Sequence, residues 1–142
     1  MALSADDKKH IKSFWQPAAA HSEKLGPEAL HRLFISSPQT KTYFPKFDFH
    51  KDSPHIRAHG KKVFDALTEA ANHLDNIPGC LSKLSDLHAY DLRVDPGNFA
   101  LLTHHLLVVF AIHFPEKFDT LTHQALDKFL VAVSGVLTSK YR

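Results

Sequence analysis

Residues 53–74 of the chain, SPHIRAHGKKVFDALTEAANHL, decide its fold. The Ser53-Pro54 pair is a helix-start signal, because serine caps the first turn and proline suits the first helical position. After this pair, apolar residues follow at steps of three and four, and His59 lies on the same stripe as Ile56 and Val63. The spacing predicts an amphipathic helix with one histidine directed inward.

Helical signals continue on both sides of this stretch. Ser4 with Asp7 is a capping pair that predicts a first helix reaching about residue 19 or 20, and Asp119 is placed to cap the last helix. Four further pairs mark stops or starts of helices: Gly26-Pro27, Ser37-Pro38, Pro78-Gly79 and Asp95-Pro96. With five glycines and no Asn-Gly or Asp-Gly hairpin signal, we predict an all-α fold and a single domain over residues 1–142.

Residues 99–114 differ from the other helical segments because apolar residues cover nearly every face. Twelve of these sixteen residues are apolar. A helix that is apolar all round is not a surface helix. Either the domain covers this segment completely, or part of it meets another chain.

Composition excludes several classes of function. The net charge of +2 is too small to indicate nucleic-acid binding. The longest apolar run, residues 106–112, is far short of the roughly 20 residues that span a bilayer. The N-terminal residues include acids where a signal peptide needs an apolar core, so we expect no secretory signal peptide. The presence of only one cysteine fits a reducing, intracellular setting. The one cysteine, Cys80, excludes an internal disulfide and a Cys-based zinc site.

Histidine is unusually frequent, with 12 residues, and two histidines lie on apolar stripes. His59 is one, and His88 follows Leu84 by four residues and Leu81 by seven. Each could be a core histidine bonded to a main-chain carbonyl. Together they could instead flank one flat apolar ligand, with one of them binding a metal. Most other histidines are expected to be solvated: His10, His21, His31, His50, His55, His73 and His123. Cys80 is expected to be a small residue between helices.

Six motifs resemble, in their order and spacing, the α-type subunits of vertebrate haemoglobin, members of the globin family. They are TKTYFP at 40–45, AHGKKV at 58–63, LSDLHA at 84–89, LRVDP at 92–96, LDKFL at 126–130 and LTSKYR at 137–142. The resemblance spans the whole chain. The short stretch between Phe44 and His59 is similar to that of α-type chains, which lack the extra short helix before the distal helix of myoglobin and β-type chains.

The resemblance implies a globin fold around haem b, iron protoporphyrin IX. His88 would be the proximal iron ligand, and its other ring nitrogen would donate to a nearby carbonyl or hydroxyl, for which Leu84 is a candidate. His59 would lie on the opposite, distal side and donate a hydrogen bond to O₂. The remaining pocket residues implied by the resemblance are Tyr43, Phe44, Phe47, Lys62, Val63, Leu67, Leu84, Leu87, Leu92, Val94, Asn98, Phe99, Leu102 and Leu137.

The function implied is reversible oxygen transport in the cytoplasm of red blood cells, as a subunit that assembles with β-type globin chains into a tetramer of two α and two β chains. The partner surface would include residues 99–118, Arg32 and the last helix. The protein would not be an enzyme. Two alternatives remain. The first is an enzyme, either a haem peroxidase or a nitrite- or nitric-oxide-converting globin, although the turn after His59 offers no arginine. The second is a helical interaction module without a cofactor.

Overall fold

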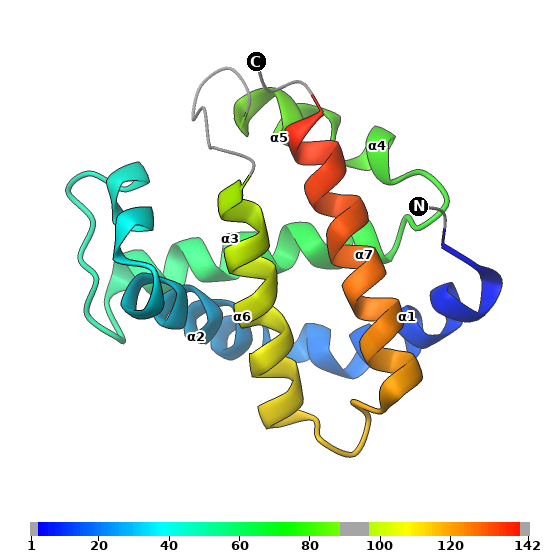
Figure 1. Ribbon diagram of the computed structural model, residues 1–142. Coiled ribbons are helices and arrows are strands. Elements are labelled where there is room, and N and C mark those ends of the chain that lie inside the picture. Colours follow the sequence, from blue (N-terminus) through cyan, green and yellow to red (C-terminus); the bar gives the residue numbers. More distant parts are fainter. Residues whose placement is uncertain (1–2, 89–96, 140–142) are drawn as a thin grey trace.

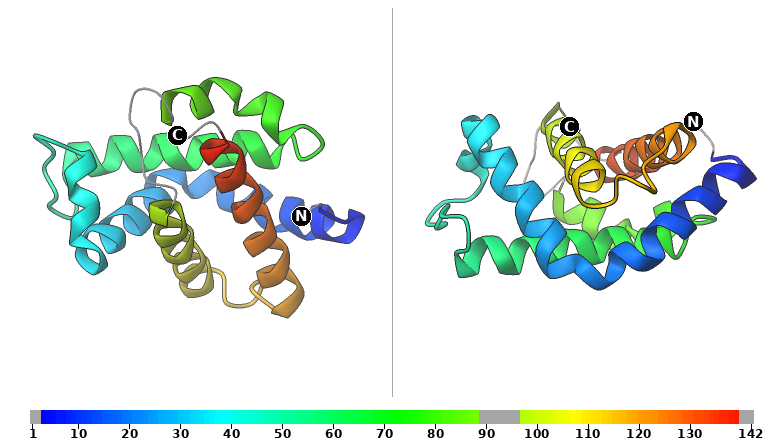
Figure 2. Two further views of the ribbon diagram at one scale, coloured as in Figure 1. Left: turned by 45° about the horizontal axis from the view of Figure 1, so that its top comes forward. Right: turned by 90° about the horizontal axis from the view of Figure 1, so that it is seen from below.

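The chain is built from helices packed at steep angles to one another. The computed structural model describes residues 3–88 and 97–139, and every regular element within these ranges is helical, which confirms the predicted class. The α-helices are α1 (Ala5–Ala18), α2 (Ser22–Ser36), α3 (Pro54–Ala71), α4 (Ile77–Cys80), α5 (Ser82–Asp86), α6 (Gly97–His113) and α7 (Thr120–Thr138), and the 3₁₀ helices are η1 (Ala19–His21) and η2 (Pro38–Tyr43). α6 and α7 run antiparallel to each other and cross the directions of α2 and α3 (Figures 1 and 2).

Three helix starts predicted from side-chain caps are confirmed. At α1, the Ser4 hydroxyl accepts a hydrogen bond from the Asp7 amide, and the Asp7 carboxylate accepts one from the Ser4 amide, both at 3.0 Å. Ser53 accepts from the Ile56 amide at the start of α3, and Asp119 accepts from the Thr122 amide at the start of α7. Each cap satisfies amides that have no partner within the helix.

The predicted stop and restart at Gly26-Pro27 is wrong, because α2 continues through both residues. Pro27 costs α2 one main-chain hydrogen bond. Gly26 and Pro27 are both buried against Gly60 of α3, at a distance that leaves no room for a Cβ on either glycine. Packing between the two helices therefore overrides the local signal. The irregular turn lies earlier, in η1.

The segments around α3 follow the predictions with one correction. η2 begins at Pro38, as the Ser37-Pro38 pair predicts, and residues 44–53 contain no helix. Pro78-Gly79 does not end the long helix, which stops at Ala71; the pair lies inside α4, where proline occupies the first turn. The start signal at Asp95-Pro96 lies outside the described residues.

An aromatic cluster forms the centre of the larger core. The Trp15 ring of α1 stacks on Phe64 of α3 with centroids 5.2 Å apart, and Phe110 of α6 and Phe129 of α7 meet its edges. Trp15 is only 2% exposed, and its indole nitrogen donates a hydrogen bond to the Thr68 hydroxyl at 2.9 Å. A smaller core cluster contains Leu30, Leu33, Phe34 and Ile56.

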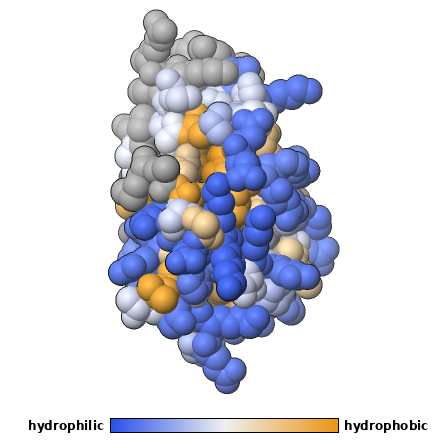
Figure 3. Space-filling view, turned by 90° about the vertical axis from the view of Figure 1, so that its right-hand side faces the viewer, coloured by the Kyte–Doolittle hydropathy of each residue, from blue (hydrophilic) through white to orange (hydrophobic). Residues whose placement is uncertain are grey.

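The surface is largely polar on the face drawn in Figure 3, where hydrophilic residues surround a narrow apolar strip. α6 is not completely covered, since Phe110 is buried but Ile112 is 49% exposed. Of the helices within residues 3–88 and 97–139, none is long and apolar enough to cross a bilayer.

Candidate functional site

A cavity of about 480 Å³ opens between α3, α5, α6 and α7. Cavities of this size are typical of small-molecule and cofactor sites. Most of the side chains that line it are aliphatic or aromatic, and His59 and His88 both reach it. The sequence placed these two histidines on separate apolar stripes, and the fold brings them to one cavity.

His88 follows the end of α5 and has one ring nitrogen held by the main chain. Its Nδ1 lies 2.8 Å from the carbonyl oxygen of Leu84, the partner that the sequence suggested. Because a carbonyl oxygen only accepts hydrogen bonds, a neutral His88 carries its proton on Nδ1 and keeps a lone pair on Nε2. The ring also packs against Phe99, with centroids 5.4 Å apart. His88 is therefore an oriented imidazole with one nitrogen available to a metal.

His59 lies on α3 in a different environment. Its ring meets the Phe44 ring edge to face, with centroids 5.0 Å apart. Burial lowers the pKa of His59, and electrostatic interactions with Lys62 and with His88 lower it further. His59 is thus neutral near pH 7, and a neutral imidazole has one N–H donor and one acceptor.

The structure brings most of the predicted site residues together. Those that line the cavity are His59, His88, Tyr43, Phe44, Lys62, Val63, Leu67, Leu84, Leu87, Asn98, Phe99, Leu102 and Leu137. Phe47 is not among the lining residues. Its ring centroid lies 5.0 Å from that of Phe44 and 6.1 Å from that of His59, so it packs against two residues that do line the cavity. The predicted residues Leu92 and Val94 lie outside the described residues.

Comparison with known proteins identifies the family of the chain. The sequence pattern of the globin family matches residues 27–137. Hemoglobin subunit alpha of Xenopus tropicalis is 73% identical, hemoglobin subunit alpha-2 of Xenopus laevis is 70% identical, and hemoglobin subunit alpha-C of Aquarana catesbeiana is 62% identical, each over the full length of both chains. The chain belongs to the globin family. Within this family it is a haemoglobin α-type chain of vertebrates.

Sequence reasoning missed part of the cavity wall of this globin. The additional lining residues are Leu30, Leu33, Thr40, Ala66, Leu81, Thr103, Leu106, Leu130, Val133 and Ser134. Several of them lie on apolar stripes, where a wall residue and an ordinary core residue have the same pattern. Only the packing of α2, α6 and α7 distinguishes the two.

Polar side chains of this globin gather at the cavity edge. Asn98 of α6 donates a hydrogen bond to the Tyr43 hydroxyl at 2.8 Å, which ties α6 to η2. Lys62 is exposed while it also borders the cavity. A ligand in this cavity would therefore meet apolar walls inside and a cationic side chain at the rim.

A second depression, of about 350 Å³, lies along α2 and is lined by Glu28, His31, Arg32, Ile35, Ser36 and Lys51. His31 is half-buried, which corrects the prediction that it is solvated, and its Nδ1 is buried without a hydrogen-bond partner among the described residues. Glu28 accepts hydrogen bonds from Arg32 and from His113 of α6.

Proposed function

We propose that this chain binds dioxygen reversibly and transports it, as the α-type subunit of a haemoglobin with haem b in the cavity between His59 and His88. The observation that carries the proposal is the hydrogen bond from His88 Nδ1 to the Leu84 carbonyl at 2.8 Å, inside an apolar cavity that His59 also borders. An imidazole oriented in this way is a preformed metal ligand.

The residues of the cavity fit haem b. Haem is a flat apolar group with iron at its centre and two carboxylates on one edge. The interior of the cavity offers aliphatic and aromatic walls, among them Leu84, Leu102 and Leu137. Lys62 at the rim suits the carboxylates, because a lysine stem can lie along an apolar surface while its ammonium group stays in water.

Each group of residues around the cavity would have a separate role in oxygen binding. Haem supplies a ferrous iron that binds dioxygen reversibly. His88 would hold the iron through Nε2, and the Leu84 carbonyl would fix the orientation and increase the basicity of the imidazole. His59 would offer an N–H donor to dioxygen on the distal side, and Val63, one turn further along α3, would limit the space there. The apolar walls would exclude water and so slow oxidation of the iron.

The same residues favour a carrier over an enzyme. A peroxidase needs a cationic donor beside the distal histidine to help break the O–O bond. No arginine lines the cavity within residues 3–88 and 97–139, and Lys62, the cation of α3 that borders the cavity, is exposed. We therefore propose oxygen carriage, which is not an enzymatic activity.

The partners proposed are β-type globin chains, in a tetramer of two α and two β chains in the cytoplasm of red blood cells. Three large apolar side chains support such an interface: Ile35 is 65% exposed, Ile112 is 49% exposed and Leu121 is 59% exposed. Arg32 lines the depression beside Ile35. Aromatic and arginine side chains next to exposed apolar ones are typical of interface centres.

An absorbance spectrum followed by an oxygen equilibrium curve tests the proposed function. The purified chain should carry haem and change its visible spectrum reversibly as oxygen is added and removed. Adding a β-type chain should convert a hyperbolic oxygen curve into a sigmoidal one. A chain that purifies without haem and cannot be loaded with it would instead support a cofactor-free interaction module.

A further inference from the structure

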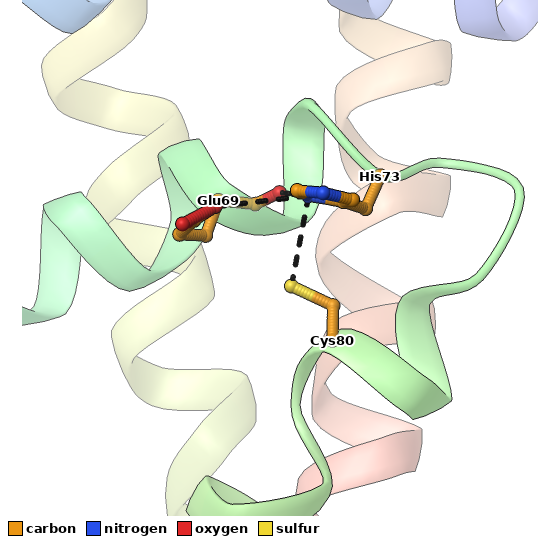
Figure 4. A group of neighbouring side chains, drawn as sticks. All are labelled: Glu69, His73 and Cys80. Atoms are coloured by element: carbon orange, nitrogen blue, oxygen red, sulfur yellow. Dashed lines mark hydrogen bonds and ion pairs between the residues drawn. The ribbon is translucent and has the colours of Figure 1, made fainter.

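Three potential metal ligands meet on the surface, away from the haem cavity. They are Glu69 near the end of α3, His73 just after α3 and Cys80 at the end of α4 (Figure 4). Their ligand atoms all lie within 4.8 Å of one another. We propose that Glu69, His73 and Cys80 bind a zinc ion.

The distances between the ligand atoms suit zinc after small rotations of side chains. His73 Nδ1 lies 4.0 Å from Cys80 Sγ and 3.7 Å from the Glu69 carboxylate. A tetrahedral zinc ion with Zn–N and Zn–O distances of about 2.0 Å and a Zn–S distance of about 2.3 Å separates its ligands by about 3.3 to 3.5 Å. Because Glu69 and His73 are exposed, they can close this gap without repacking the core.

The main chain holds Cys80 in place beside His73. The Asn76 amide donates to the His73 carbonyl at 3.0 Å, and the Cys80 amide donates to the Asn76 carbonyl at 3.1 Å. The Asn76 side chain caps α4 by accepting from the Gly79 amide at 3.2 Å. A Cβ at residue 79 would collide with the side-chain amide of Asn76, so a larger residue there would displace this cap. The cysteine is therefore positioned before any ion arrives.

The histidine can turn to a metal at small cost. At present His73 Nδ1 donates to the Glu69 carbonyl at 2.8 Å. That carbonyl also accepts from the Asn72 amide at 3.1 Å. It therefore keeps a hydrogen-bond partner when His73 moves its proton to Nε2 and presents the Nδ1 lone pair to the ion.

The ligand types select zinc over the common hard cations. A thiolate, an imidazole and a carboxylate are the usual zinc ligands, whereas Mg²⁺ and Ca²⁺ prefer oxygen ligands alone. Burial raises the pKa of the Cys80 thiol, and the charge of Glu69 raises it further, so zinc must displace the thiol proton when it binds. A thiolate and a carboxylate together neutralise the ion, and water would occupy the fourth position.

This proposal revises two expectations from the sequence. The single cysteine excluded a Cys-based zinc site, and His73 was expected to be merely solvated. Both residues remain near the surface, but the turn through α4 returns the chain to the end of α3 and places Cys80 against His73. A spacing of seven residues across a helix end and a loop does not match a known zinc motif.

Protection of the cysteine from alkylation tests the proposal. The haem-loaded assembly with a β-type chain is treated with iodoacetamide in the presence of increasing Zn²⁺, and the intact mass of this chain is followed. Cys80 is its only cysteine, so one adduct reports the site. Zinc should slow the reaction, and His73→Gln or Glu69→Gln should each raise the zinc concentration needed for protection by about tenfold or more. Mg²⁺ should give no protection.

A matched control and a second measurement complete the test. His50→Gln removes an exposed histidine that also contacts an acid, Asp48, and should leave protection unchanged. Equilibrium dialysis should find one zinc ion fewer on each Cys80→Ser chain than on the unaltered chain. Unchanged alkylation at every zinc concentration, equal protection in His73→Gln, or equal zinc content in Cys80→Ser would each overturn the proposal.

Discussion

Gly26 of α2 and Gly60 of α3 touch where the two helices cross. A Cβ built on Gly26 would collide with the carbonyl group of Gly60, and one built on Gly60 would collide with the main chain of Gly26 and Pro27. Gly60 follows His59 in the sequence, so this crossing also fixes the position of His59, the proposed distal histidine. Glycine is required here for close approach of two main chains.

Gly60→Ala should therefore destabilise the protein by about 1–3 kcal/mol or more, because the helices must separate to admit the methyl group. Gly135→Ala is the matched control: no atom lies within 4 Å of a Cβ at that position. Alanine there should stabilise α7 by about 0.5–1 kcal/mol. Urea unfolding of both variants measures the two effects. A similar free energy of unfolding for the two variants would contradict the role given to the crossing.

Thr68→Val should destabilise the core, because it removes the acceptor for the buried Trp15 indole N–H. The expected loss is about 1–3 kcal/mol, the cost of an unsatisfied buried donor. Thr68→Ser keeps the hydroxyl and should restore most of the stability. Urea unfolding monitored by tryptophan fluorescence suits this test, since Trp15 is the chain's only tryptophan. If valine lowers stability no more than serine does, the hydrogen bond contributes no more than the methyl group that serine lacks, which would contradict this prediction.

Much of the fold could be predicted because its signals are local. Ser4, Ser53 and Asp119 form caps within three residues of themselves, and the stripes on α3 and α7 mark the buried faces. The continuity of α2 through Pro27 could not be predicted, because its cause lies in α3. For the same reason, the contact between Cys80 and His73 could not be predicted, because it depends on the turn through α4.

The candidate site was predictable in part. His59 and His88 have apolar neighbours at helical spacing, and the i−4 carbonyl of Leu84 is a local partner that the sequence suggests. Lining residues such as Leu130 and Val133 have the pattern of any core position, so their place at the cavity depends on tertiary packing. Phe47 illustrates the opposite case, since the resemblance placed it in the pocket, whereas its ring packs against Phe44 and does not line the cavity.

Glu28→Gln should change how stability depends on pH. Burial acts to raise the pKa of Glu28, but hydrogen bonds from His113 and Arg32 together hold it below the ordinary value of 4.5. An acid with a lowered pKa stabilises the fold above its unfolded-state pKa and loses that contribution as the pH falls. The stability difference between the unaltered chain and Glu28→Gln should thus shrink below about pH 4.5. Thermal unfolding at several pH values measures this difference, and Glu116→Gln, at an exposed position, is the control. A stability difference that stays the same at every pH would contradict the role given to Glu28.

Ile35→Glu should weaken assembly with a β-type chain by about 2 kcal/mol or more, which is roughly 30-fold in the dissociation constant. The reason is that a charge would replace an apolar side chain that is 65% exposed at the proposed interface. Ala5→Glu is the control, since Ala5 is also an exposed apolar residue but lies on α1, outside the proposed interface. Analytical ultracentrifugation of each variant mixed with a β-type chain measures the two dissociation constants. Equal weakening would place the interface elsewhere.

The central claim is that His88 binds the haem iron, while His59 lies on the opposite side of the haem and donates a hydrogen bond to bound oxygen. It is tested most directly by measuring the rate of haem transfer from His88→Gly and His59→Gly to an excess of a haem-scavenging protein. We expect His88→Gly to lose haem rapidly and His59→Gly to retain it, with oxygen dissociating about 5- to 30-fold faster, the equivalent of one lost hydrogen bond of about 1–2 kcal/mol. Equal haem retention by the two variants would contradict the roles assigned to these histidines.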